Sequence, residues 1–352
     1  MSGRLGAVSS PGLPERRPPA TLYDVAREAE VSIATVSRAL NGATNRRVKD
    51  HYYARVVAAA EKLGYTPNQS AQSMARGATR TVALLVSDIA DPFYSSIAAG
   101  VIRVADQEGF QVSIGVTERD LRREYELVRL LRSQRPQVVA LAGSRFDDES
   151  GRDRLVRELN LYLRSGGRVV TISEPELPFP TLRIDNSGGA RRLATRLVDL
   201  GYKGFAILGG PPDLATTRIR VDSFAEALAG FGIRPRYVAH GDFNADGGRE
   251  LMQGLADRGL DDVDLIFAAN DLMAVGALSV LRERGYSVPE DVGLAGFDDI
   301  VMARIVTPAL TTVAIPLEDV GEAALRLALN EPTSSLAKVP VEVVVRASTP
   351  QR

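Results

Sequence analysis

Short apolar runs alternate with amphipathic stretches along most of this chain. The apolar runs predict strands over residues 81–87, 111–116, 137–143, 168–172, 203–208, 264–268 and 292–296. Segments of helical periodicity separate most of them. Continuous apolar strands joined by helices predict parallel sheets that helices cover on both faces. Residues 79–352 are too many for one such sheet, so the pattern predicts an α/β fold with two doubly wound subdomains.

The first 80 residues have a different pattern. Residues 1–20 are rich in Pro, Gly, Ser and Arg, which is typical of a disordered tail and not of a secretory signal, so we expect a cytoplasmic protein. Three short helices follow: 22–29 after the N-cap Thr21, 33–40 after the N-cap Ser32, and 50–63 before Gly64. Asp50 is a candidate cap of the third helix. Its inward positions are predicted to be Val56, Val57, Ala60 and Leu63.

The net charge of −1 hides an asymmetry. Residues 1–80 carry 12 Lys and Arg against 6 Asp and Glu, so this end is +6 and the remainder is −7. A basic end on an acidic body points to contact with a polyanion; the alternative is a merely solvated charged surface.

Several classes of function are excluded by what the sequence lacks. There is no Cys, and the two histidines, His51 and His240, lie far apart, so a metal site is not expected. No phosphate-binding loop, dinucleotide-binding glycine motif or nucleophile elbow occurs. The adjacent carboxylates of Asp298 and Asp299 should point apart at a strand end. We expect no enzyme activity, no cofactor and no membrane span.

Residues 21–42 carry the strongest signal. Two short helices joined by a tight turn at Glu30-Val31 predict a helix-turn-helix, whose second helix can lie in a major groove of DNA. Ile33, Ala34 and Thr35 would be exposed at the start of that helix, with Ser37 and Arg38 one turn further on. Arg can bond guanine in bidentate fashion, while Ile and Ala can contact a thymine methyl group. The alternative is an ordinary amphipathic helical hairpin.

The sequence also resembles a known family in several motifs. TLYDVAREAEVSIATVSRALNG (21–42) resembles the headpiece of the lac repressor family of bacterial transcription regulators, and LGYTPNQSAQSMARG (63–77) resembles its hinge segment. The resemblance continues through VALLVSDIADPFYSSIAAGV (82–101), IDNSGGARRLATRLVDLGY (184–202), AAND (268–271), VGLAGFDD (292–299) and PALTTV (308–313).

This resemblance implies a headpiece over 21–66, a hinge helix within 67–78, and an effector-binding core of the periplasmic-binding-protein type. It implies one subdomain from 79–183 with 308–335, and a second from 184–307 with 336–348. The hinge helix would run from Asn68 to Arg76, with Met74 as the apolar wedge in the minor groove. The implied DNA-binding residues are Thr21, Ser32, Ile33, Ala34, Thr35, Ser37, Arg38, Asn41, Arg46, Arg47, Tyr52, Asn68 and Met74.

Three positions depart from the family pattern. Glu30 occupies a turn position where the family usually has Gly or Asn, and left-handed backbone there would cost about 1 kcal/mol. The loop 42–47 is two residues longer than usual and adds Arg46 and Arg47 as candidates for phosphate contacts. The third helix opens without the family's Ser cap and Thr-Arg pair, so Tyr52 or Tyr53 is expected to replace those contacts.

The effector site is predicted at the carboxyl ends of the strands, where ligands bind in open α/β sheets. Acidic, amide, guanidinium and aromatic side chains gather there, a set that suits sugar hydroxyls and a sugar face. By family position the expected residues are Phe93, Tyr94, Thr216, Arg220, Phe243, Asn270 and Asp298. Arg220 is expected to face the cleft and to contribute little packing. The alternative is that Asp271 and Asp298 cap helices and the aromatic rings fill the core; for Asp271 this alternative is favoured.

Taken together, these features predict a transcription regulator, most often a repressor, that binds operator DNA as a homodimer. A small effector, a sugar or sugar derivative, would change the closure of the two subdomains and so the operator affinity. A tetramer is not expected, because no heptad-repeat helix follows VPVEVVVRAS. The alternatives are a solute-binding protein or a sugar-processing enzyme on a similar α/β body.

Overall fold

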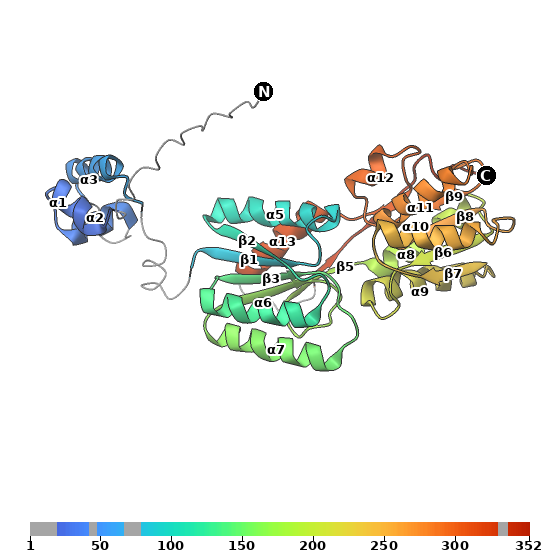
Figure 1. Ribbon diagram of the computed structural model, residues 1–352, viewed down its shortest axis with the longest axis horizontal. Helices are drawn as coiled ribbons and strands as arrows, with labels where there is room; N and C mark the ends of the chain where they lie inside the picture. Colours follow the sequence, from blue (N-terminus) through green and yellow to red (C-terminus); the bar gives the residue numbers. More distant parts are fainter. Residues whose placement is uncertain (1–19, 42–47, 67–78, 330–336) are drawn as a thin grey trace, which may run out of the picture. The chain divides into compact units, whose positions relative to one another are not determined.

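The computed structural model describes residues 20–41, 48–66, 79–329 and 337–352. The chain divides into two compact units, Met1–Arg76 and Gly77–Arg352 (Figure 1). The predicted tail up to residue 19, the loop 42–47 and the hinge helix Asn68–Arg76 lie outside the described residues, and these predictions remain untested.

The first unit contains the three predicted helices, α1 (Leu22–Glu28), α2 (Ile33–Asn41) and α3 (Asp50–Leu63). Thr21 and Asp24 cap α1 reciprocally, and the Ser32 hydroxyl accepts the Thr35 amide at 3.2 Å. Gly64 ends α3 in the left-handed region, with φ 60°. The core of this unit consists of Val25, Ala26, Ala29, Val36, Val56, Ala59 and Ala60.

Two details of the headpiece differ from the prediction. Lys49, and not Asp50, is the N-cap of α3, and it makes no side-chain capping bond. Val57 is only partly buried, since Ala59 takes the inward position. The expected strain is present, because Glu30 has φ 49°. The Arg55 guanidinium lies 2.8 Å from the Glu30 carboxylate and holds this turn against α3.

The second unit begins with a six-stranded parallel sheet. Its strands lie in the order β11 (Ala337–Val339), β5 (Thr181–Ile184), β4 (Arg168–Ile172), β3 (Val138–Ala142), β1 (Thr81–Val86) and β2 (Gln111–Val116). Helices α5 (Pro92–Glu108) and α13 (Leu317–Leu329) cover one face, while α6 (Leu121–Gln134) and α7 (Glu149–Arg164) cover the other (Figure 1). Buried apolar side chains fill both faces of β1 and β3, as their continuous apolar sequence predicts.

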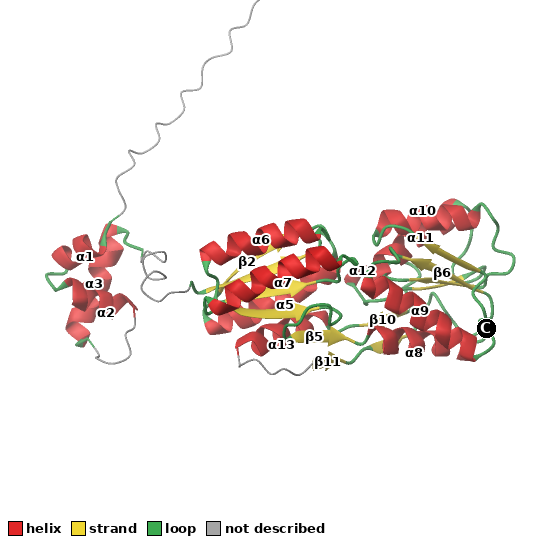
Figure 2. Cartoon of the chain, turned by 90° about the horizontal axis from the view of Figure 1, so that it is seen from below, coloured by secondary structure: helices red, strands yellow, loops and turns green. Residues whose placement is uncertain are grey.

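A second parallel sheet has the order β7 (Tyr237–His240), β6 (Phe205–Gly209), β8 (Leu265–Ala268) and β9 (Gly293–Ala295). Helices α8 (Asn186–Asp199) and α9 (Ala215–Gly230) pack on one face, and α10 (Ala245–Ala256) and α11 (Asp271–Glu283) on the other (Figure 2). The short helix α12 (Val301–Ile305) follows β9. The two doubly wound subdomains are therefore those that the sequence predicts.

The chain crosses between the subdomains at three places. The first crossing joins β5 to α8, and the other two lie near the antiparallel pair β10 (Thr312–Ala314) and β12 (Glu342–Val344). β11 still pairs with β5, so the chain returns to the second subdomain after Val339 and not at 336 as expected.

Candidate functional site

The exposed face of α2 carries most of the predicted DNA-binding side chains. Val36 is fully buried against α1 and α3, so the opposite side of the helix faces outward. Ile33 is 47% exposed, and Ala34 and Arg38 are exposed as well, while Thr35 and Ser37 are half-buried. The Arg38 Nε donates to the Ala34 carbonyl oxygen at 3.0 Å, which lays the guanidinium along the helix. Tyr52 is 38% exposed on α3.

The other predicted DNA contacts divide into two groups. Thr21 and Ser32 are exposed and use their hydroxyls to cap α1 and α2. The Asn41 side chain, Arg46, Arg47, Asn68 and Met74 lie outside the described residues.

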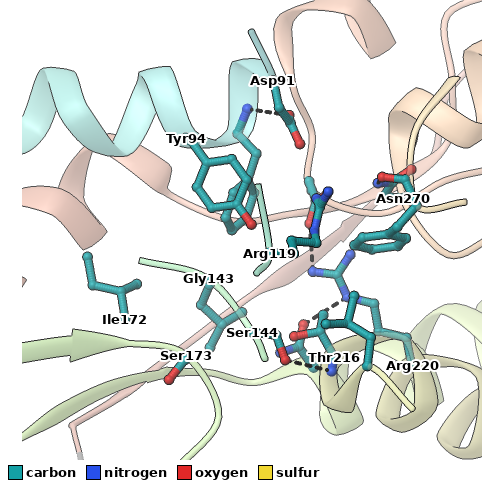
Figure 3. Close-up of a pocket in the computed structure, with 16 residues that line it drawn as sticks. Asp91, Tyr94, Arg119, Gly143, Ser144, Ile172, Ser173, Thr216, Arg220 and Asn270 are labelled. Atoms are coloured by element: carbon teal, nitrogen blue, oxygen red, sulfur yellow. Dashed lines mark hydrogen bonds and ion pairs between the residues drawn. The ribbon is translucent and has the colours of Figure 1, made fainter. Parts of the chain in front are cut away.

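A cavity of about 530 Å³, including its solvent-open mouth, lies between the two subdomains at the carboxyl ends of their strands (Figure 3). All seven predicted effector residues line it. Phe93 and Tyr94 come from α5 in the first subdomain, and the other five come from the second subdomain. The two rings of Phe93 and Tyr94 meet edge to face, with centroids 5.0 Å apart.

Arg220 differs from its prediction in one respect. It lines the cavity, yet it is only 2% exposed and is one of the largest fully buried side chains of the described residues. Its guanidinium donates to Asn186 Oδ1 at 2.9 Å, to the Ala269 carbonyl at 2.9 Å and to Asp298 Oδ1 at 2.7 Å. It also stacks on Phe297, 3.9 Å from the ring centroid. The expectation that Arg220 contributes little packing is wrong, because the cavity wall is built around it.

Asp298 holds its carboxylate in the cavity wall through an unusual backbone. Its φ of 115° lies in the left-handed region, and its amide donates to the carbonyl oxygen of Val313 in β10. Burial raises the pKa of Asp298 to about 6, although the Arg220 guanidinium opposes that shift. The Asp299 carboxylate points to other partners, Arg304 and Arg346, as the sequence predicts for adjacent residues.

The side chains of Asn270 and Asp271 make different hydrogen bonds at the start of α11. Asn270 Oδ1 accepts the Met273 amide at 2.8 Å, so Asn270 and not Asp271 caps the helix. Asp271 is fully buried and accepts from the Ile300 amide and the Thr312 hydroxyl. Burial raises the pKa of Asp271 well above its usual value. Its role is structural, but the prediction that Asp271 caps a helix is wrong, because Asn270 is the N-cap of α11.

The sequence prediction missed nine further residues of the cavity wall. They are Asp91, Arg119, Gly143, Ser144, Ile172, Ser173, Ile184, Asn186 and Leu214. Asp91 accepts the Phe93 amide at 2.9 Å and caps α5, and burial raises its pKa. Arg119 lies on the loop after β2 with φ 58°, and its guanidinium carbon is 5.7 Å from the centroid of the Phe243 ring. Arg119 and Ser144 follow the carboxyl ends of β2 and β3, and this position after two predicted strands is the signal in the sequence that points to them.

Known proteins match the chain along most of its length. Residues 21–68 match the family described as bacterial regulatory proteins, lacI family, and residues 194–349 match a periplasmic binding protein-like domain. The transcriptional repressor CytR of Escherichia coli is 33% identical over 339 residues, covering 94% of this chain and 96% of CytR. The regulator CelR of Thermobifida fusca is 35% identical over 338 residues, which cover 94% of this chain and 97% of CelR. The chain belongs to the lacI family of bacterial regulatory proteins.

Solved structures of this family share the fold. The lac repressor dimer bound to operator and the anti-inducer ONPF has a TM-score of 0.81 at 26% identity, covering 94% of this chain and 99% of that one. A CelR–cellobiose complex has a TM-score of 0.67 at 33% identity, and the match covers 94% of this chain and 100% of the CelR chain. This lacI-family chain is therefore a DNA-binding transcription regulator and not an enzyme. No helix within the described residues is long and apolar enough to cross a membrane.

Proposed function

We propose that this lacI-family regulator is a cytoplasmic repressor that binds a sugar or sugar derivative in the cavity between its subdomains. The cavity wall carries this proposal. Carboxylate acceptors from Asp91 and Asp298 and the Arg119 guanidinium line it together with the Phe93 and Phe243 rings. Hydroxyl groups both donate and accept, and the apolar face of a sugar ring packs on aromatic rings, so this set fits a polyhydroxylated ligand.

Phe243 offers a direct test of this site. It follows β7, packs against Arg119 and lies beside the N-cap of α11, because Asn270 Nδ2 donates to its carbonyl. We expect Phe243→Ala to lose sugar binding in calorimetric titrations with a panel that includes cellobiose and ribose, because the ring surface is gone. Phe231→Ala is the matched control, since that ring is 49% exposed at the end of α9. Equal binding by wild type and Phe243→Ala would show that the ligand site lies elsewhere.

We assign operator reading to the exposed start of α2, with the chain acting as a dimer on a pseudopalindromic site. Ile33, Ala34 and Arg38 are the exposed side chains that support this assignment. A helix of this kind places its first turns in the major groove. The phosphate contacts are assigned to Thr21, Arg46, Arg47 and Tyr52, and the minor-groove wedge to Met74.

Arg38 should therefore set sequence preference. Selection from a random DNA pool should enrich one pseudopalindrome with the wild-type protein. Arg38→Ala should weaken binding to that sequence by about 1–3 kcal/mol, while its binding to random DNA changes little, since one bidentate base contact is lost. Arg46→Ala is the control: it should weaken both equally and flatten the salt dependence. An equal loss on both DNAs for Arg38→Ala would contradict the base contact.

A further inference from the structure

Two loops meet across one edge of the cavity. The loop after β3 belongs to the first subdomain, and the segment before α9 belongs to the second. Phe146 and Leu214 form an isolated antiparallel bridge, and the Asp147 amide donates to the Asp213 carbonyl at 3.1 Å. Backbone pairing thus joins the two subdomains at a place where the chain itself does not cross.

Side chains reinforce this pairing. The Ser144 hydroxyl donates to Glu176 Oε1 at 2.8 Å. It also accepts the amide of Thr216, from the other subdomain, at 3.1 Å (Figure 3). At the outer side, Arg218 Nη1 lies 2.9 Å from Asp147 Oδ2. Both members of that ion pair are well exposed, at 43% and 58% of their side-chain areas.

Buried hydrogen bonds within the first subdomain fix the loop after β3. Arg145 is 7% exposed, and its Nε donates to Glu124 Oε2 on α6 at 2.8 Å. Its backbone amide donates to Glu176 Oε2 at 3.2 Å. Breaking a buried pair of this kind is strongly unfavourable, whereas an exposed ion pair contributes little. Separation will therefore occur between the subdomains and leave the loop itself intact.

The same residues form part of the cavity wall. Ser144, Leu214 and Thr216 line the cavity, and Leu214 is only 1% exposed. A solute that enters from this edge must break the contacts between the two loops. Once the solute is bound inside the cavity, the same contacts can form again. Closure of this edge and occupancy of the cavity are therefore linked.

We propose that residues 144–147 and 213–218 form a latch that holds the ligand-free cleft closed and sets how often it opens. The latch is marginal because its outer contacts are exposed, so open and closed forms exchange without ligand. An effector that contacts both walls shifts this equilibrium further toward closure. The effect of cleft closure on operator affinity rests on the proposed function. The opening and closing of the cleft do not depend on it.

The absence of native Cys allows a direct measurement of closure. Asp153→Cys on α7 and Asp222→Cys on α9 place one exposed thiol on each subdomain for a donor–acceptor dye pair. In single-molecule energy transfer without added solute, the closed form should dominate. Arg218→Ala should raise the open-to-closed ratio about two- to fivefold, the range expected for an exposed ion pair.

Arg152→Ala is the matched control. Its guanidinium lies 4.0 Å from the same Asp147 carboxylate, but it belongs to the same subdomain, so the ratio should stay unchanged. Asp147→Lys should open the cleft, and Asp147→Lys combined with Arg218→Glu should restore closure. An unchanged ratio in Arg218→Ala, an equal shift in Arg152→Ala, or a cleft that is mostly open with the native latch would each overturn the proposal.

The readout on DNA separates the latch from the proposed function. Operator affinity is measured on the sequence selected by the wild-type protein. If Arg218→Ala changes both the open-to-closed ratio and the operator affinity, the result supports the latch and also the control of DNA binding by closure. A changed ratio with unchanged operator affinity supports the latch and contradicts control of DNA binding by closure.

Discussion

Arg220 shows at the scale of one residue how ligand contact and structure are combined. Its three partners lie 34, 49 and 78 residues away along the chain, on α8, after β8 and after β9. A single guanidinium therefore ties together three segments of the second subdomain. Asp298 would be left as a buried carboxylate without its cation if Arg220 were removed.

Arg220→Met should consequently destabilise the second unit. We expect a loss of about 3–5 kcal/mol in the free energy of unfolding, as for other broken buried ion pairs. Urea unfolding, followed by far-UV circular dichroism, measures this loss. Arg119→Met is the control, with an expected loss of about 0.5–1 kcal/mol from its contact with Phe243. Native stability in Arg220→Met would show that the pair is not structural.

Asp298 should give the stability of this unit a recognisable pH dependence. Its pKa of about 6 in the folded chain exceeds the ordinary value of 3.8, because burial disfavours the charged form. The folded chain therefore holds this proton more tightly than the unfolded chain. The stabilisation that results is complete below about pH 4 and is lost as the pH rises through about 6.

The comparison of wild type with Asp298→Asn isolates this effect. The difference between their free energies of unfolding should change by up to about 3 kcal/mol between pH 4 and pH 7, since each pKa unit corresponds to about 1.4 kcal/mol. Thermal unfolding across that range measures it. Parallel curves for the two proteins would mean that Asp298 does not titrate in this window.

At the scale of the elements, the sequence predicts the strands with continuous apolar runs and misses the others. β5 has four residues, two of them polar, β7 alternates between half-buried and exposed residues, and β10, β11 and β12 have three residues each, so none forms a long apolar run. The seven predicted effector residues do line one cavity, because strand ends and family positions agree there. The burial of Arg220 could not be predicted, since it depends on partners that only the tertiary fold brings together.

Helices α5 and α13 pack unusually closely through glycine. A Cβ atom at Gly100 would lie 1.9 Å from the Glu318 carbonyl oxygen, and one at Gly321 would lie 2.1 Å from that of Ile97. Gly100→Ala should force the helices apart and cost about 1–3 kcal/mol in thermal or urea unfolding. Gly230→Ala in α9 is the control, because nothing lies within 4 Å of its Cβ position. A Gly100→Ala protein as stable as the control would contradict the close helix contact.

At the scale of the whole molecule, we assign part of the dimer interface to α12. α12 has five residues, and two of them are strongly exposed apolar side chains, Val301 at 57% and Ile305 at 66%. Val301 and Ile305 are four residues apart and so lie on one side of α12, and we propose that the dimer interface buries both side chains. Val301→Asp with Ile305→Asp should shift the dimer toward monomer in sedimentation, while Phe231→Asp should not. A dimer that the α12 changes leave intact would contradict this assignment.

We propose that a small molecule in the cavity of the second unit controls DNA binding by the first. The most direct measurement is titration of the selected operator duplex by fluorescence anisotropy, with and without a panel of mono- and disaccharides. We expect one member of the panel to change the operator affinity of the wild-type protein about 5- to 150-fold, the usual range of allosteric coupling. Phe243→Ala should bind the operator normally and show no response. No response of the wild type to any member, or an equal response in Phe243→Ala, would contradict the claim.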